Sequence, residues 1–93
     1  MSDFIEQLFT LIQDRKENPK TDSYTTSLFV DGEDKIVQKV GEEAVEVIIA
    51  AKGQGNQRII EESADLIYHL LVMLTEKGLT WDDVCQELEK RHK

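Results

Sequence analysis

Residues 42–65 read EEAVEVIIAAKGQGNQRIIEESAD, and this stretch decides the fold of the chain. Two largely apolar helical segments flank the sequence Gly53-Gln54-Gly55, which has the composition of a turn. Both segments carry acids three residues apart, a spacing that places them on one face of a helix. These acids are Glu42, Glu43, Glu46, Glu62 and Asp65. The pattern predicts a helix hairpin in which both arms present carboxylates.

Folding back at Gln54 would bring the acids of the two arms together. Residues equally far from the turn lie at the same level, so Glu43 should face Asp65 and Glu46 should face Glu62. Carboxylates that converge in this way repel one another unless a cation neutralises them. An all-oxygen site without cysteine suits Mg²⁺, with Mn²⁺ as the alternative, rather than zinc or copper. We therefore expect four metal ligands: Glu43, Glu46, Glu62 and Asp65.

A divalent ion held by carboxylates favours one class of reaction. Such ions neutralise a leaving pyrophosphate and lower the pKa of an attacking water, so the site predicts hydrolysis of a phosphoanhydride. Glu42, at the edge of the acidic stripe, could position that water. An isolated E-x-x-E pattern is more often a solvated helix face. Here the mirror placement and the apolar neighbours of Asp65 favour the metal site, because a buried acid needs a partner.

Four helices are expected, over about residues 3–17, 33–52, 56–77 and 81–91. The predicted caps and stops are Ser2 or Asp3, Asn56, Gly78, and Thr80 with Asp83. The stretch from Thr21 to Phe29 is rich in hydroxyls and lacks helical periodicity, so we expect an ordered loop there. No segment alternates like a strand. The prediction is an all-α, four-helix bundle-like domain over residues 1–93.

Apolar residues cover more than half of the circumference of the helix expected over 33–52, so most of that helix should be buried. The helix expected over 56–77 is apolar on nearly every side. A 93-residue chain buries only about 60–65% of its unfolded surface and would have a thin core on its own. We therefore expect a homodimer or a larger homo-oligomer.

Composition excludes several classes of function. The net charge of −8, from 19 acidic and 11 basic residues, argues against nucleic-acid binding. The longest nearly apolar run, residues 66–74, is far too short to span a membrane. One cysteine, Cys85, cannot form an internal disulfide, and the first residues show no leader pattern. The sequence is typical of a cytoplasmic protein with a small-molecule substrate.

Five further residues are candidates for contact with that substrate: Tyr24, Thr25, Ser27, Lys39 and His69. Lys39, one turn before Glu43, could bind a phosphate or form an ion pair within its helix. The three hydroxyl residues could hold phosphate or base, or could only pack the loop. His69, one turn after Asp65, could touch substrate or be a satisfied core histidine. The sequence leaves each of these alternatives open.

The acidic motif E-E-x-x-E followed by E-x-x-D resembles the signature of the MazG-like all-α nucleoside triphosphate pyrophosphatase superfamily. Within it, four stretches are similar to the phosphoribosyl-ATP pyrophosphatase (phosphoribosyl-ATP pyrophosphohydrolase) family: residues 24–28, 39–44, 50–52 and 64–71. The resemblance implies Mg²⁺-dependent hydrolysis of 1-(5-phosphoribosyl)-ATP to 1-(5-phosphoribosyl)-AMP and pyrophosphate, an early step of histidine biosynthesis, in a homo-oligomer. Some family members are fused to a cyclohydrolase domain, and at this length we expect the stand-alone form.

Two alternatives follow from the same residues. The first is a house-cleaning nucleotide pyrophosphatase of the same superfamily, which would act on other nucleoside triphosphates with the same metal chemistry. The second is a noncatalytic helical interaction domain whose acidic stripe binds a basic partner. A stripe of that kind should face solvent instead of lying among isoleucines and leucines. Magnesium binding separates the second alternative from both enzymes.

Overall fold

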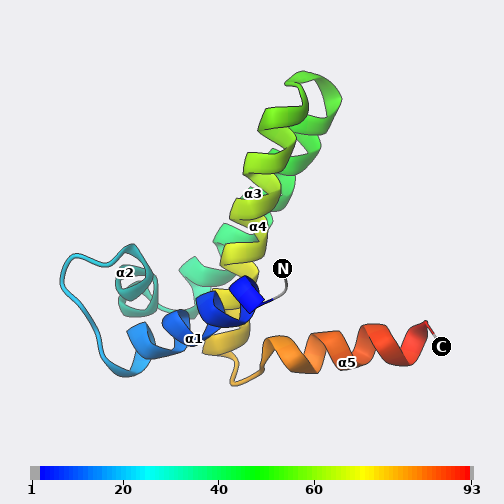
Figure 1. Ribbon diagram of the computed structural model, residues 1–93. Helices are drawn as coiled ribbons and strands as arrows, with labels where there is room; N and C mark the ends of the chain where they lie inside the picture. Colours follow the sequence, from blue (N-terminus) through cyan, green and yellow to red (C-terminus); the bar gives the residue numbers. More distant parts are fainter. Residues whose placement is uncertain (1–2, 93) are drawn as a thin grey trace.

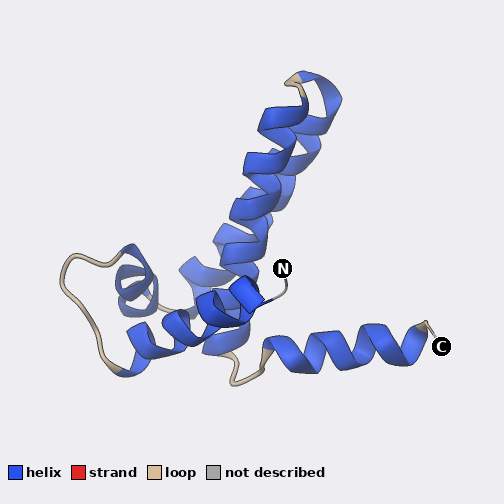
Figure 2. Ribbon diagram, in the orientation of Figure 1, coloured by secondary structure: helices blue, strands red, loops and turns tan. Residues whose placement is uncertain are grey.

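The computed structural model describes residues 3–92, and all regular structure in that range is helical (Figure 2). The helices are α1 (Asp3–Glu17), α2 (Tyr24–Asp31), α3 (Glu33–Gly53), α4 (Asn56–Glu76) and α5 (Trp81–Arg91). This confirms the all-α prediction and the approximate bounds of the four expected helices. The predicted first cap lies outside the described part, because neither Ser2 nor the side chain of Asp3 is described.

Helices α3 and α4 form the predicted hairpin, which extends beyond the other helices (Figure 1). The turn falls at Gln54, whose N–H donates to the carbonyl of Ala50 at 3.0 Å. Gly55 has φ of +90°, a conformation that residues with a Cβ rarely adopt. Gly55 also precedes the first residue of α4, so it takes the N-cap position predicted for Asn56. The turn chemistry thus sets the register that brings the acids together.

The expected loop between Thr21 and Phe29 was a wrong prediction, since most of it belongs to α2. The side chain of Ser23 caps this helix by accepting a hydrogen bond from the N–H of Thr26. Thr26 and Leu28 are buried against the rest of the chain. Eight residues rich in hydroxyls have little helical tendency alone. Capping and tertiary burial therefore stabilise a helix that the sequence pattern does not indicate.

The hydrophobic core lies at the base of the hairpin, where α1, α2 and α3 meet α4. Its buried members are Phe9, Ile12, Leu28, Ile36, Leu71, Val72 and Leu74. Trp81 and Val84 of α5 pack against this cluster, while the rest of α5 extends away from it (Figure 1). Thr80 and Asp83 form the predicted capping box at the start of α5. Gly78, with φ of +75°, ends α4 as expected.

The outer half of the hairpin leaves many apolar side chains exposed. Val45 and Ile48 on α3 are 52% and 61% exposed, and Ile60 on α4 is 61% exposed. The expectation that most of the helix over 33–52 is buried is thus wrong for a single chain. The radius of gyration is 14.2 Å, whereas a compact chain of this length should have about 12 Å. One copy of this chain does not cover its own apolar surface.

Candidate metal centre and active site

The hairpin brings three of the predicted ligands together: Glu43 of α3 and Glu62 and Asp65 of α4. One carboxylate oxygen from each lies within 4.8 Å of the others. Glu43 and Asp65 are equally far from Gln54, as the antiparallel register requires. Glu62 and Asp65 are three residues apart on one face of α4. The donor set is entirely carboxylate oxygen, which fits a hard divalent ion such as Mg²⁺ or Mn²⁺.

Burial distinguishes this cluster from an ordinary surface stripe. Glu62 is only 6% exposed, and Glu43 is partly buried. Asp65 is exposed, so the burial expected from its apolar neighbours was a wrong prediction. Two cations compensate part of the charge: Arg58 pairs with Glu62, and Lys39 lies 3.3 Å from Glu43. Asp65 has no ion pair among residues 3–92. A basic protein partner could not easily reach a carboxylate as buried as Glu62, which disfavours the interaction-domain alternative.

Glu46 lies outside this group of three. It is partly buried on α3, one turn closer to the hairpin tip than Glu43. Its predicted neighbour Glu62 is instead held by Arg58, which also contacts Glu61 at 2.5 Å. A shared level in the hairpin fixes the height of two residues but not the directions of their side chains. The role of Glu46 as a ligand therefore stays a prediction.

Glu42 and Lys39 form a polar rim beside the acids on α3. The amide of Gln38 donates to Glu42 at 2.6 Å, and Lys39 lies 3.4 Å from the same carboxylate. The Gln38 hydrogen bond and, after it, Lys39 hold the pKa of Glu42 below its usual value. Partial burial acts against the charge of Lys39, but hydrogen bonds to Glu43 and Glu42 and the nearby Tyr24 give it a net raised pKa. Lys39 is thus a persistent cation, and its predicted ion pair is present.

His69 is buried, 7% exposed, and both of its ring nitrogens have partners. Nδ1 donates to the carbonyl of Asp65 at 2.8 Å, so in the neutral ring Nε2 accepts from the Tyr24 hydroxyl at 3.0 Å. The interpretation of His69 as a satisfied core histidine is therefore correct in this structure. The same contacts tie the start of α2 to the turn of α4 that carries Asp65.

The predicted hydroxyl residues lie on α2 instead of a loop. Thr25 hydrogen-bonds the hydroxyl of Tyr68, whereas Ser27 donates to the carbonyl of Tyr24 within its own helix at 2.5 Å. Tyr68, which sequence reasoning did not select as a site residue, stacks on Tyr24 with ring centroids 6.2 Å apart. Burial raises the pKa of Tyr68, and the Thr25 hydrogen bond opposes that shift. Tyr68 follows Asp65 by three residues, and this spacing could have marked it as a candidate site residue.

Comparisons with known proteins show the family of the chain. Residues 5–92 match the family described as Phosphoribosyl-ATP pyrophosphohydrolase. The chain is 54% identical over 87 residues to the phosphoribosyl-ATP pyrophosphatase of Limosilactobacillus fermentum, covering 94% of this chain and 82% of that protein. It is 47% identical over 92 residues to the enzyme of the same name from Bacillus mycoides, covering 99% of this chain and 86% of that protein.

A longer relative matches equally well. The histidine biosynthesis bifunctional protein HisIE of Caldanaerobacter subterraneus is 50% identical over 91 residues, which cover 98% of this chain and 44% of that protein. The match over nearly the whole chain includes both arms of the hairpin, and with them all of the predicted metal ligands. The chain therefore belongs to the phosphoribosyl-ATP pyrophosphohydrolase family.

Proposed function

We propose that this protein hydrolyses 1-(5-phosphoribosyl)-ATP to 1-(5-phosphoribosyl)-AMP and pyrophosphate, a step of histidine biosynthesis. Water adds across the phosphoanhydride bond between the α and β phosphorus atoms, and pyrophosphate leaves. The observation that carries the proposal is the convergence of Glu43, Glu62 and Asp65 within 4.8 Å in a chain of this family. The choice of this substrate rests on the names of the relatives, because the geometry of the acids alone fits other nucleoside triphosphates as well.

The ligands that we propose for Mg²⁺ are Glu43, Glu62 and Asp65, with Glu46 as a fourth. When bound, the ion would neutralise the triphosphate and lower the pKa of a coordinated water. The closeness of Glu43, Glu62 and Asp65 favours binding of a divalent cation, because the ion relieves their mutual repulsion in the metal-free site. Arg58 fixes the carboxylate of Glu62.

The rim residues of α3 supply the remaining groups. The hydrogen bond from Gln38 lowers the pKa of Glu42, and the side chain is exposed where a water can approach. We assign it the role of orienting that water. Lys39 remains charged and offers a point charge to a phosphate oxygen. Tyr24, Thr25 and His69 hold α2 against α4 and so shape the wall beside the acids.

We propose that the protein acts as a homodimer, in which a second copy covers the hairpin. The exposed apolar residues along the hairpin are Val37, Val45, Ile48, Ile49, Ile60 and Ile67. At about 25 cal/mol per Å², covering side chains of this size is a strong driving force for association. No described helix has the length and apolarity to cross a membrane. The free Cys85 fits a reducing compartment, and we place the protein in the cytoplasm.

A coupled assay for pyrophosphate tests the activity directly. Purified protein should release pyrophosphate from 1-(5-phosphoribosyl)-ATP with Mg²⁺ present, and excess EDTA should abolish release. Deoxynucleoside and ribonucleoside triphosphates, tested side by side, should give a much lower kcat/KM. A preference for an ordinary triphosphate would replace the proposed substrate with that of a house-cleaning enzyme. Rescue of a histidine auxotroph that lacks this step provides the same test in cells.

A further inference from the structure

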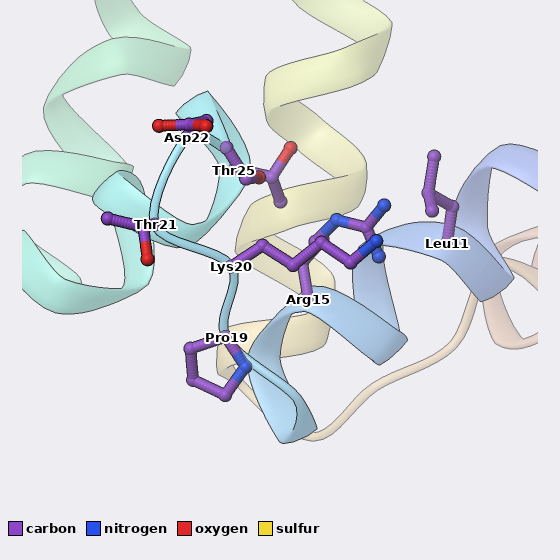
Figure 3. Close-up of a pocket in the computed structure, with 8 residues that line it drawn as sticks. Leu11, Arg15, Pro19, Lys20, Thr21, Asp22 and Thr25 are labelled. Carbon is purple, nitrogen blue, oxygen red and sulfur yellow. The ribbon is translucent and has the colours of Figure 1, made fainter.

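A polar pocket lies away from the acidic cluster, between the end of α1, the segment that follows it and the start of α2 (Figure 3). Its volume is about 610 Å³, which is within the usual range for small-molecule sites. Arg15 and Lys20 line it together with the hydroxyl residues Thr21, Ser23 and Thr25. In Figure 3 the nitrogen-bearing ends of Arg15 and Lys20 lie in the same part of the pocket.

The charged residues that line the pocket sum to +1 in a chain whose net charge is −8. Its lining contains two cations and a single acid, Asp22. Arg15 pairs with Asp14 at 2.8 Å, but that residue does not line the pocket. Lys20 forms no ion pair with any residue from 3 to 92. Two neighbouring cations with several hydroxyl groups can bind a phosphate. None of the side chains that line the pocket is aromatic, which disfavours binding of a nucleobase.

The segment that carries Lys20 is held in place by hydrogen bonds. The N–H of Lys20 donates to the hydroxyl of the buried Thr26 at 3.0 Å, and its carbonyl accepts from Ser23 at 3.1 Å. Pro19 restricts the backbone just before it. A cation on a pre-ordered segment loses less entropy on binding than one on a mobile loop. The backbone that carries Lys20 is therefore fixed on both sides by its neighbours.

One wall of the pocket leads to the acidic cluster. Thr25 lines the pocket and hydrogen-bonds Tyr68 of α4. Its neighbour Tyr24 bonds His69, whose ring also bonds the backbone of Asp65. A ligand that spans the two places needs phosphates at two separate ends. Phosphoribosyl-ATP has this form, with a triphosphate on one ribose and a single phosphate on the other.

We infer that the pocket of Arg15 and Lys20 binds the single phosphate of the phosphoribosyl group, an inference that rests on the proposed function. Binding there distinguishes phosphoribosyl-ATP from ATP, which has no second ribose phosphate. In this proposal the acids of the hairpin take part in the hydrolysis, and the pocket selects phosphoribosyl-ATP over ATP.

The test measures KM for phosphoribosyl-ATP and Ki for ATP as a competitive inhibitor. The variants are Arg15→Gln, Lys20→Gln and their combination, with the exposed Lys90→Gln on α5 as the matched control. A hydrogen bond to a charged group accounts for about tenfold or more in affinity. The combined variant should raise KM at least about tenfold, while kcat, the Ki for ATP and the thermal midpoint stay near wild type. Lys90→Gln should change none of these.

The alternative outcomes each decide the matter. If KM is unchanged, or if KM and the Ki for ATP rise together, the subsite assignment is wrong while the hydrolase remains. If the wild-type protein does not hydrolyse phosphoribosyl-ATP at all, the proposed function and this subsite both fail. Lys20 is exposed, so Lys20→Gln remains informative even if Arg15→Gln unfolds the protein. Lys20→Arg should restore most of the lost affinity, because it restores the charge.

Discussion

Replacing Asp65 by Asn should change the stability of the protein in opposite directions with and without magnesium. In the metal-free protein, Asp65 repels Glu43 and Glu62 across distances of at most 4.8 Å. At this distance each pair repels by about 0.9 kcal/mol in a water-like dielectric. Asn removes two of the three repulsions and keeps the shape of the side chain. After screening by salt and nearby cations, we expect a gain of about 1 kcal/mol.

A gain of that size corresponds to a rise in Tm of about 4–8 °C for a domain of this length, measured by calorimetry in EDTA. Saturating Mg²⁺ should reverse the order. At about one hundred times its Kd, a ligand stabilises the native state by about 2.7 kcal/mol, and only the wild-type protein should gain this. Asp65→Asn should also lose nearly all turnover. The matched control is Glu89→Gln on α5, an exposed acid without an ion pair among residues 3–92, which should leave the Mg²⁺ response intact.

A lower Tm of Asp65→Asn in EDTA combined with a retained Mg²⁺ shift would refute this reasoning. That result would mean that Asp65 contributes a structural contact and that the ion binds elsewhere. Full turnover of the variant at limiting Mg²⁺ would lead to the same conclusion.

Three further predictions concern other parts of the chain. Ile48→Asp should shift the protein from dimer to monomer in sedimentation experiments, while Val30→Asn on α2 should not; a monomeric wild type would contradict the proposed dimer. Glu42→Gln should lower kcat by about a hundredfold or more without changing the Mg²⁺ shift, and normal kcat would remove Glu42 from the mechanism. The raised pKa values of Lys39 and Tyr68 mean that the native state holds these protons more tightly than the unfolded chain. The two protonated groups therefore stabilise the fold below pH 10.0, and this contribution is lost as the pH rises through their pKa values in the native state. Urea unfolding should show a lower free energy of unfolding at pH 11 than at pH 9, and the difference should be smaller in Tyr68→Phe.

The hairpin and most of its acidic cluster could be predicted because they follow from local rules. Apolar periodicity gave the helices, and the turn at Gln54 set which residues lie at one level. The facing of Glu43 and Asp65 needs no other part of the chain. The exclusion of Glu46 from the observed group depends on side-chain direction and on the Arg58 contact with Glu62. Sequence spacing does not contain that information.

Tertiary context accounts for the features that the sequence did not predict. Helix α2 has weak helical tendency and depends on the Ser23 cap and on burial of Thr26 and Leu28. The pocket of Arg15 and Lys20 forms only because α1 and α2 are brought together around a short connection. The apolar residues of α3 suggested burial, but a periodic pattern does not tell whether the covering surface belongs to the same chain or to another copy.

Anomalous diffraction from a crystal soaked in Mn²⁺ tests the central claim most directly. We expect an anomalous peak between α3 and α4, with oxygens of Glu43, Glu62 and Asp65 at coordination distance. A map with no peak there, while all three carboxylates point into bulk solvent, would contradict the account.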